Sequence, residues 1–336
     1  MRLLAVETSC DDSAAAVLDS QGNVLSEIIA TQTEHHTHGG VVPEIASRLH
    51  MSVLPGLIRE VLEKSSTSLK NIDVFAATAG PGLTGSLLVG LSWAKAAAYA
   101  RNKPFLGINH LAAHIHIHFN SDVEFPAVAL LVSGGHTMLF FMKSWRECVL
   151  LGTTRDDAAG EAFDKTAKLM GLGYPGGRII DNISVNGDPD SVVLPLPLGN
   201  KKIPEFSFSG LKTAVRLKWE TNLITKEDLA ASFQKTVCKI LVSKTLYQAH
   251  KLQAKSILVA GGVSANSRLR AEFKTECAKR GLSLFVPEKK HSMDNAVMVG
   301  RAALSALQAN PKANSGLRCN TFPRWHGELL FPLSQL

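Results

Sequence analysis

The amino-acid sequence predicts an α/β protein that consists of two similar lobes with a ligand cleft between them. Its 336 residues, of which 45% are hydrophobic and 19% charged, suffice for two cores and exclude a natively disordered chain. Short apolar runs first follow one another and then alternate with helical stretches, which indicates a mixed sheet covered by helices. A strand, a polar turn and a returning strand occur at residue 2 and again at residue 127. This repeated order predicts an internal duplication.

The first lobe is expected over residues 1–124. Turn formers separate its first three strands, which predicts an antiparallel meander that leads into helices and further strands. Pro55 lies inside the first long helix and predicts a kink or break there. The expected elements are strands at 2–7, 13–18 and 24–30, a helix at 44–64, a strand at 73–79, a helix at 83–100, a strand at 104–108 and a helix at 110–119.

The second lobe is expected over residues 125–309, and the tail 310–336 is expected to pack back on the first lobe. Strands at 127–132 and 137–142 flank a small polar turn, in the same order as the start of the first lobe. Two similar lobes, each with such a turn facing inward, would hold a ligand in the cleft between them.

Glycine-rich turns follow several of the expected strands. The strand 256–260 runs into the turn Gly261–Asn266 and a helix, an arrangement in which free backbone N–H groups face an anion. The turn Gly80–Gly85 lacks the Lys-Ser/Thr ending of a Walker A loop, and the segment around Ser209 lacks the G-x-S-x-G of a hydrolase elbow. P-loop and nucleophile-elbow chemistry are therefore not expected.

Two histidines have the spacing of a metal site. His110 and His114 are four apart on an expected helix, so both side chains leave the same face, and His118 continues that stripe. Asp294, just before another helix, is a candidate third ligand. Leu111, Ala112 and Ala113 fill the gap between the histidines, where an H-E-x-x-H motif would need its Glu, which argues against a zinc peptidase. Histidines without a metal are the other interpretation of this spacing.

Acidic residues gather near expected helix starts. Asp164 lies on a segment that is otherwise small and apolar, and Asp181 follows the tight turn Tyr174–Gly177. Both are candidates to face a ligand, although acids near a helix N-terminus also serve as partners of the helix dipole.

The charge is divided unevenly along the chain. Residues 1–200 carry 14 Lys and Arg against 20 Asp and Glu, whereas residues 201–336 carry 22 against 9, a net charge of +13. The basic part is a plausible footprint for a phosphate backbone, and it is equally compatible with solvated helix faces.

Composition also bears on the compartment. The apolar runs 127–132 and 257–260 are far shorter than the ~20 residues that cross a bilayer, and no export signal is evident, so we expect a cytoplasmic protein. The five cysteines lack CxxC spacing and are expected to be buried thiols.

Taken together, the motifs of the chain resemble those of one family. They are Glu7–Asp11, Gly39–Glu44 with Ser47 and Arg48, Pro81–Leu83, His110 with His114, Val132–Thr137, Asp157–Lys165, Tyr174–Gly177, Phe206–Thr213, Gly261–Asn266 and Asp294 with Asn295. In this order and spacing they resemble the TsaD (formerly Gcp) family, the tRNA adenosine threonylcarbamoyltransferases, from residue 2 to about residue 325.

The resemblance implies a duplicated actin-like, sugar-kinase-like (ASKHA) fold and a specific reaction. The family transfers the threonylcarbamoyl group from threonylcarbamoyl-AMP to the exocyclic amine of the adenosine following the anticodon, in tRNAs reading ANN codons, and releases AMP. One iron or zinc ion would be held by His110, His114 and Asp294. The implied substrate contacts are Leu131, Val132, Ser133, Gly134, Gly135, Asp164, Gly177, Asp181 and Asn266.

The resemblance further implies tRNA as a partner, together with a paralogous TsaB-like dimer partner and a small TsaE-like P-loop ATPase. Either Asp11 or His136 could take the proton of the amine. Many relatives have Glu where this chain has Ala112, and the Pro-Arg-Trp of the tail ends at Trp325. Two rival functions are a metal-dependent glycoprotein endopeptidase and a small-molecule kinase of the same fold.

Overall fold

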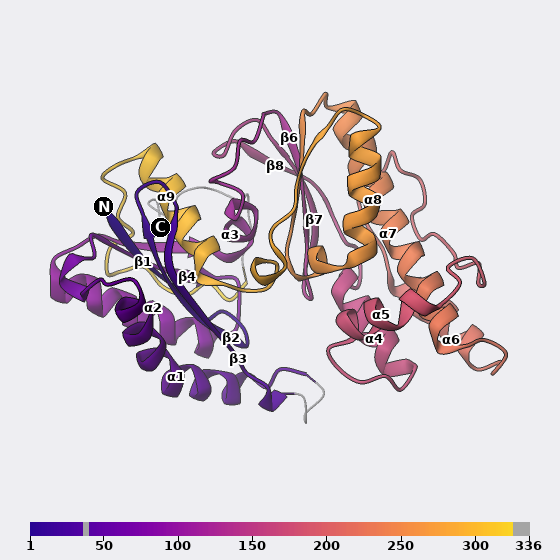
Figure 1. Ribbon diagram of the computed structural model, residues 1–336, viewed down its shortest axis with the longest axis horizontal. Helices are drawn as coiled ribbons and strands as arrows, with labels where there is room; N and C mark the ends of the chain where they lie inside the picture. Colours follow the sequence, from indigo (N-terminus) through magenta and orange to yellow (C-terminus); the bar gives the residue numbers. More distant parts are fainter. Residues whose placement is uncertain (36–39, 325–336) are drawn as a thin grey trace. The chain divides into compact units, whose positions relative to one another are not determined.

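The computed structural model describes residues 1–35 and 40–324 of the chain. Gly39 and Trp325, which belong to two of the sequence motifs, lie outside the described residues. The chain forms two compact units (Figure 1), of which unit 1 contains Met1–Asp122 and the chain from Met293, and unit 2 contains Val123–Ser292.

Unit 1 is built on a five-stranded mixed sheet with the order β3-β2-β1-β4-β5. The central strand β1 (Arg2–Glu7) pairs antiparallel with β2 (Asp12–Asp19), which pairs antiparallel with β3 (Val24–Thr31). On its other side β1 pairs parallel with β4 (Val74–Gly80), and β4 with β5 (Phe105–Asn109). The expected meander and the two later strands are thereby confirmed.

Unit 2 repeats this sheet, with the order β10-β9-β6-β7-β8. Here β6 (Ala127–Val132) pairs antiparallel with β7 (Thr137–Met142), which pairs antiparallel with β8 (Cys148–Thr153). The parallel neighbours are β9 (Ser256–Ala260) and β10 (Ser283–Phe285). The five strands match those of unit 1 in order and direction, so the predicted duplication is confirmed.

Helices cover both faces of the unit 1 sheet (Figure 1). Side chains of β1 alternate between the faces: Leu3 and Ala5 share a core with α9 (Ala296–Ala309), whereas Leu4 and Val6 pack with α1 (Pro43–Lys64) and α2 (Thr84–Arg101). The short α3 (His110–His116) packs beside α9. Each face therefore has its own apolar core.

Three details of unit 1 differ from the expectations. Helix α1 does not break at Pro55, because the turn that loses its hydrogen bond lies at the surface, where Met51 is 64% exposed. Helix α3 ends at His116, so His118 does not continue the histidine stripe. Helix α9 belongs to unit 1 rather than to the second lobe, because its apolar side chains bury against the sheet of unit 1.

The described part of the tail, residues 310–324, also lies on unit 1. The backbone N–H of Phe322 donates to Ala79 O (2.7 Å), and that of Ser315 donates to Phe105 O (2.8 Å). Lys95 Nζ donates to the carbonyl of Cys319 (2.9 Å). These bonds hold residues 310–324 against β4, β5 and α2.

Unit 2 carries five α-helices within the described part of the chain. They are α4 (Ala159–Leu169), α5 (Gly176–Ile183), α6 (Ser209–Trp219), α7 (Lys226–Lys251) and α8 (Ser267–Ala278). Short 3₁₀ segments in the two units occupy Leu69–Asn71, Ser184–Asn186, Gly262–Ala265 and Lys289–His291. No described helix of the chain is both long and apolar enough to cross a membrane.

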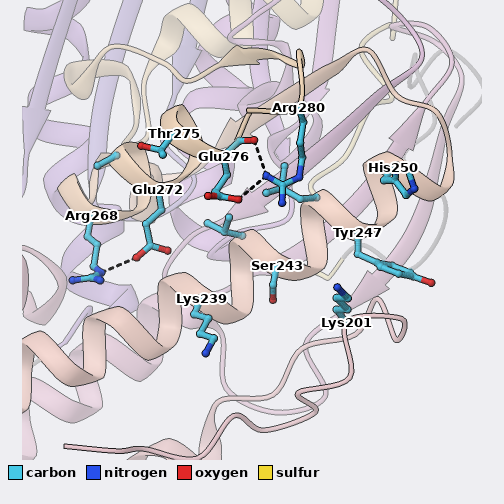
Figure 2. A pocket seen from close by; sticks show the side chains of 13 residues that line it. Lys201, Lys239, Ser243, Tyr247, His250, Arg268, Glu272, Thr275, Glu276 and Arg280 are labelled. Carbon is cyan, nitrogen blue, oxygen red and sulfur yellow. Dashed lines mark hydrogen bonds and ion pairs between the residues drawn. The ribbon is translucent and has the colours of Figure 1, made fainter. Parts of the chain in front are cut away.

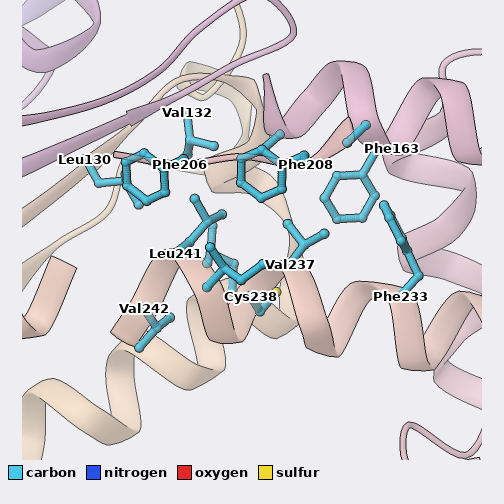
Figure 3. Packing of buried hydrophobic residues seen from close by; sticks show 14 of the residues in the cluster. Leu130, Val132, Phe163, Phe206, Phe208, Phe233, Val237, Cys238, Leu241 and Val242 are labelled. Carbon is cyan, nitrogen blue, oxygen red and sulfur yellow. The ribbon is translucent and has the colours of Figure 1, made fainter. Parts of the chain in front are cut away.

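Aromatic rings fill the core of unit 2 between these helices and the sheet (Figure 3). Phe163 of α4 meets Phe233 of α7 edge to face, with ring centroids 5.2 Å apart, and Phe206 stacks near Phe208. Both Phe163 and Phe233 are almost fully buried, so this contact fixes α4 against α7.

We predict that Phe233→Ala destabilises the protein by about 3–5 kcal/mol, because it removes a buried ring and leaves a cavity beside Phe163. Urea-induced unfolding followed by circular dichroism measures the change. Leu223→Ala is the matched control, since Leu223 is 87% exposed and its loss should shift the transition very little. Equal transitions for the two variants would contradict this account of the core.

Candidate active site

Three potential metal ligands converge within unit 1. The Nε2 atoms of His110 and His114 lie 3.5 Å and 3.1 Å from Oδ1 of Asp294. One ligand atom from each residue lies within 4.8 Å of the others, and the two imidazole rings meet edge to face with centroids 4.7 Å apart. The structure therefore brings together the two histidines and the distant aspartate that the spacing and the motifs singled out.

Two capped helices position these ligands. The side chain of Asn109 accepts a hydrogen bond from Ala112 N (3.0 Å), which fixes the start of α3 at His110. Asn295 likewise accepts from Met298 N (2.9 Å) and fixes the start of α9 directly after Asp294. An Asn before a helix is a readable N-cap signal, although the sequence interpretation assigned no role to either residue.

Glu7 contacts the imidazole nitrogen of His110 that faces away from Asp294. Its carboxylate is fully buried and accepts hydrogen bonds from Ser9 N (2.5 Å) and Thr78 Oγ1 (2.5 Å). The second oxygen also lies 3.3 Å from His110 Nδ1. A carboxylate beside Nδ1 holds the proton on that nitrogen and leaves the Nε2 lone pair directed toward a cation. This is the outer support of a metal-binding histidine, and the residues present fit a metal ion.

The electrostatics of the site favour positive charge. Burial lowers the pKa of His110, but the charges of Asp294 and then Glu7 outweigh it and raise that pKa to about 9. Burial and the charge of Asp294 also raise the pKa of Asp12 to about 7, although the Thr31 hydroxyl lowers it. For Cys10, burial and then the charges of Asp11 and Asp294 raise the pKa of the thiol. A cation at the three ligands would offset this concentration of negative charge.

His50 of α1 holds the turn between β1 and β2. It is fully buried, its Nδ1 lies 2.7 Å from Ser13 Oγ, and its Nε2 lies 3.0 Å from the carbonyl of Cys10. The turn contains Asp11, which is half-buried. Sequence reasoning missed His50, whose only signal is a histidine at a core position of an otherwise apolar helix face.

In unit 2 the expected ligand-contacting residues lie on segments that contact one another in a ring. The ring begins at the turn after β6, where Ser133 N donates to His136 O (2.8 Å) and His136 N donates to Ser133 Oγ (3.1 Å). Helix α4 follows, because Gly160 N donates to Ser133 O (3.2 Å). A Cβ at Gly160 would lie 2.6 Å from that oxygen, so only glycine permits this approach.

Carboxylates connect the next helices of this ring. Asp164 of α4 accepts from Gly176 N (2.7 Å) at the start of α5. Burial raises the pKa of Asp164, and the N–H groups of Gly176 and Gly177 partly offset the shift. Asp181 of α5 accepts from the backbone N–H (3.1 Å) and hydroxyl (2.7 Å) of Ser267, the first residue of α8.

Asn266 and Gly261 close the ring. The side chain of Asn266 accepts from Leu269 N (3.0 Å) as the N-cap of α8 and donates to Gln234 of α7 (2.7 Å). Gly261 has a φ of +88°, and a Cβ there would lie 2.5 Å from Val132 O. Glycine is therefore required where the turn after β9 meets the end of β6.

The structure distributes the predicted site residues between the units. The candidate metal ligands and Asp11 belong to unit 1, whereas His136 and all the expected ligand contacts belong to unit 2. The expected contacts in unit 2 are Leu131, Val132, Ser133, Gly134, Gly135, Asp164, Gly177, Asp181 and Asn266.

We predict that Glu7→Gln weakens Zn²⁺ binding about 10- to 100-fold, because an amide cannot act as the charged partner of His110 Nδ1. Calorimetric titration of the metal-stripped protein measures the affinity. Glu44→Gln is the control, since Glu44 is an exposed acid on α1 whose partner is Arg48. Equal Zn²⁺ affinities of the two variants would show that Glu7 does not support metal binding.

His50 should make stability depend on pH. Burial lowers the pKa of His50, although the carbonyl of Cys10 partly counters this effect. As the pH falls below about 6.5, the histidine therefore binds a proton in the unfolded state before it does so in the folded state. The contribution of His50 to stability is fully present above about pH 6.5 and is lost progressively below it. We predict that His50→Gln is less stable at pH 7.5 but loses less stability between pH 7 and pH 5.

Urea midpoints across this pH range check the prediction, with exposed His250→Gln as the control. A wild-type and a His50→Gln protein with parallel pH profiles would contradict it.

Known proteins with similar sequences point to one family. The sequence model of the family described as "TsaD: tRNA N6-adenosine threonylcarbamoyltransferase" matches residues 23–301. The protein of that name from Caldicellulosiruptor bescii is 46% identical over 317 residues, covering 92% of this chain and 94% of the relative. The one from Geobacter metallireducens is 49% identical over 306 residues, covering 89% and 90%.

Among solved structures, full-length HypF in the phosphate- and nucleotide-bound form has a similar fold. The TM-score is 0.62 at 10% sequence identity, and the match covers 93% of this chain and 56% of the HypF chain. At this identity the likeness shows a shared fold alone.

Proposed function

The chain belongs to the tRNA N6-adenosine threonylcarbamoyltransferase family, and from this premise we propose how its residues hold the metal ion and the substrates. It is a transferase that modifies an adenosine of tRNA, and it has the duplicated actin-like, sugar-kinase-like fold. The observation that supports the site most directly is the convergence of His110, His114 and Asp294 on one point.

The donor in this proposal is threonylcarbamoyl-AMP, and the acceptor is the adenosine following the anticodon in tRNAs reading ANN codons. The exocyclic amine attacks the carbamoyl carbon, the bond from that carbon to the phosphate oxygen breaks, and AMP leaves with the electron pair. The amine gives up one proton to a base. Because a mixed anhydride is already activated, the protein has mainly to position both partners and stabilise the developing charge.

His110, His114 and Asp294 would hold one divalent ion, iron or zinc, since two imidazoles and a carboxylate suit either metal. When bound, such an ion supplies Lewis-acid stabilisation of negative charge on the donor. Glu7 contributes by holding the ring of His110 in the ligating orientation. The capped starts of α3 and α9 keep the ligands in place before the substrate arrives.

The ring in unit 2 would bind the adenylate part of the donor. Backbone N–H groups of Gly134 and Gly135 in the glycine turn suit phosphate oxygens, whereas that of Ser133 already donates to His136 O. Asp164 and Asp181 are half-exposed, and a carboxylate that holds a helix start retains free lone pairs for hydroxyl groups such as those of a ribose. Both acids would therefore support the backbone and contact the ligand at once.

Asp11 and His136 remain the two candidates for the base. Asp11 lies on the turn that His50 and Thr8 hold against α1 and α2. The backbone N–H and carbonyl of His136 are both held by Ser133.

The partners in this proposal are tRNA, a TsaB-like paralogue and a small TsaE-like ATPase, and the compartment is the cytoplasm, where the tRNA substrate resides. Glycoprotein cleavage is disfavoured, because buried Leu111 stands where a peptidase with an H-E-x-x-H motif would need its general base. The shared fold is the only support for the alternative function of a small-molecule kinase, and a fold alone does not define a reaction.

We predict that the purified protein, combined with its partners, tRNA, threonine, bicarbonate, ATP and the adenylate synthase, converts adenosine to the threonylcarbamoyl nucleoside. Nucleoside mass spectrometry measures the product. His110→Ala combined with His114→Ala should abolish both the bound metal and the product, since two of three ligands are lost. An active synthase with no product from the wild-type protein would refute the function.

In the same assay, Asp11→Asn and His136→Gln distinguish the two candidate bases. Replacing the true base should lower kcat by about 10²–10⁴. If both variants keep the wild-type kcat, neither residue is the base.

A further inference from the structure

A groove between α7 and α8 of unit 2 has no role in the site described above (Figure 2). It encloses about 720 Å³ and lies entirely within unit 2. One wall is a stripe along α7 at helical spacing, and the other wall comes from α8. The lining residues are Lys201, Lys239, Val242, Ser243, Leu246, Tyr247, His250, Arg268, Ala271, Glu272, Thr275, Glu276 and Arg280.

The two walls differ in charge. On α8, each acid of the groove already has a cationic partner: Glu272 pairs with Arg268 (2.7 Å), and Glu276 pairs with Arg280 (2.5 Å). The α7 wall contains no acid, and it carries Lys239 and, from the neighbouring loop, Lys201. An anion in the groove would therefore meet neutralised acids on one side and exposed ammonium groups on the other.

The α7 wall also offers an aromatic surface and hydroxyl groups. Lys201 Nζ lies 5.9 Å from the ring centroid of half-buried Tyr247. Ser243 lies one turn before Tyr247 on the same wall. From Lys239 to His250 the stripe spans about 16 Å of helix, which is an extended surface rather than a point site.

The groove suits a phosphate chain better than a protein helix. An amphipathic helix needs open apolar pockets for its anchor residues. Val242 and Leu246, the large apolar residues that line the groove, are only 5% exposed each and leave little such surface. The surrounding segment 201–292 carries 18 Lys and Arg against 7 Asp and Glu. Its positive electrostatic potential attracts polyanions.

We propose that the α7–α8 groove binds the phosphate backbone of the tRNA substrate, with Lys201 and Lys239 as its principal phosphate contacts. The proposal rests on the proposed function, since that function supplies the tRNA. It assigns to unit 2 a surface that positions the tRNA and takes no part in the transfer itself.

The charge-reversed variant Lys201→Glu/Lys239→Glu tests the groove. Both lysines are exposed, so the thermal midpoint should stay unchanged. We expect tRNA binding, measured by fluorescence anisotropy at about 0.1 M salt, to weaken at least tenfold. The slope of log K against log salt should fall by about 1–2, because each lost phosphate contact contributes roughly 0.7–0.9.

The matched control is Lys226→Glu/Lys274→Glu, which changes the net charge by the same amount at exposed lysines of α7 and α8 that lie outside the groove lining. It should weaken tRNA binding less than twofold. In the modification assay, the groove variant should raise the KM for tRNA at an unchanged kcat, as expected for uniform binding.

Equal affinities of the groove variant and the wild type, or equal losses in the groove and control variants, would overturn the proposal. If the groove variant keeps its tRNA affinity but no longer binds one of the partner proteins, the groove is a protein-docking surface and the proposal is wrong. The proposed function fails separately, through absence of the modified nucleoside from the wild-type reaction.

Discussion

The buried carboxylate of Glu7 is the constraint on which the geometry of unit 1 depends. A fully buried charge is costly unless its lone pairs are satisfied, and its partners come from separate parts of the fold: Ser9 N just beyond β1, the Thr78 hydroxyl on β4 and the imidazole of His110 on α3. Satisfying all three fixes the turn after β1 against β4 and α3. The same contact sets the orientation of His110, so the stability of the fold and the geometry of the metal ligands share one requirement.

Unit 2 uses polar side chains in a comparable way, but at helix ends. Asp164, Asp181 and Asn266 satisfy backbone N–H groups at the starts of α5 and α8. The carboxylates join α4 to α5 and α5 to α8, and the bond from Gly160 N to Ser133 O joins α4 to the glycine turn after β6. A ligand that enters this ring therefore meets a backbone already held in place, which reduces the ordering cost of binding.

The duplicated fold explains why the two units carry different candidate site residues on the same arrangement of strands. Both sheets have the same strand order and directions, and in both a polar turn follows the central strand. Unit 1 also contains α3 and α9, at whose starts the three candidate metal ligands lie. In unit 2 the equivalent turn is rich in glycine and contacts α4. One scaffold thus presents two different sets of candidate site residues.

The sequence by itself predicted eight of the strands, the repeated strand–turn–strand unit and the His110/His114 pair of candidate metal ligands, because apolar periodicity, turn formers and helical spacing act over a few residues. The edge strands β8 and β10 were not predicted. Only the tertiary structure decided that α1 passes through Pro55, that α9 completes unit 1 and that His118 lies beyond α3. It alone revealed Glu7 and His50 as supports. Those outcomes depend on burial and on contacts between residues far apart in the chain, such as Glu7 with His110, which no local pattern encodes.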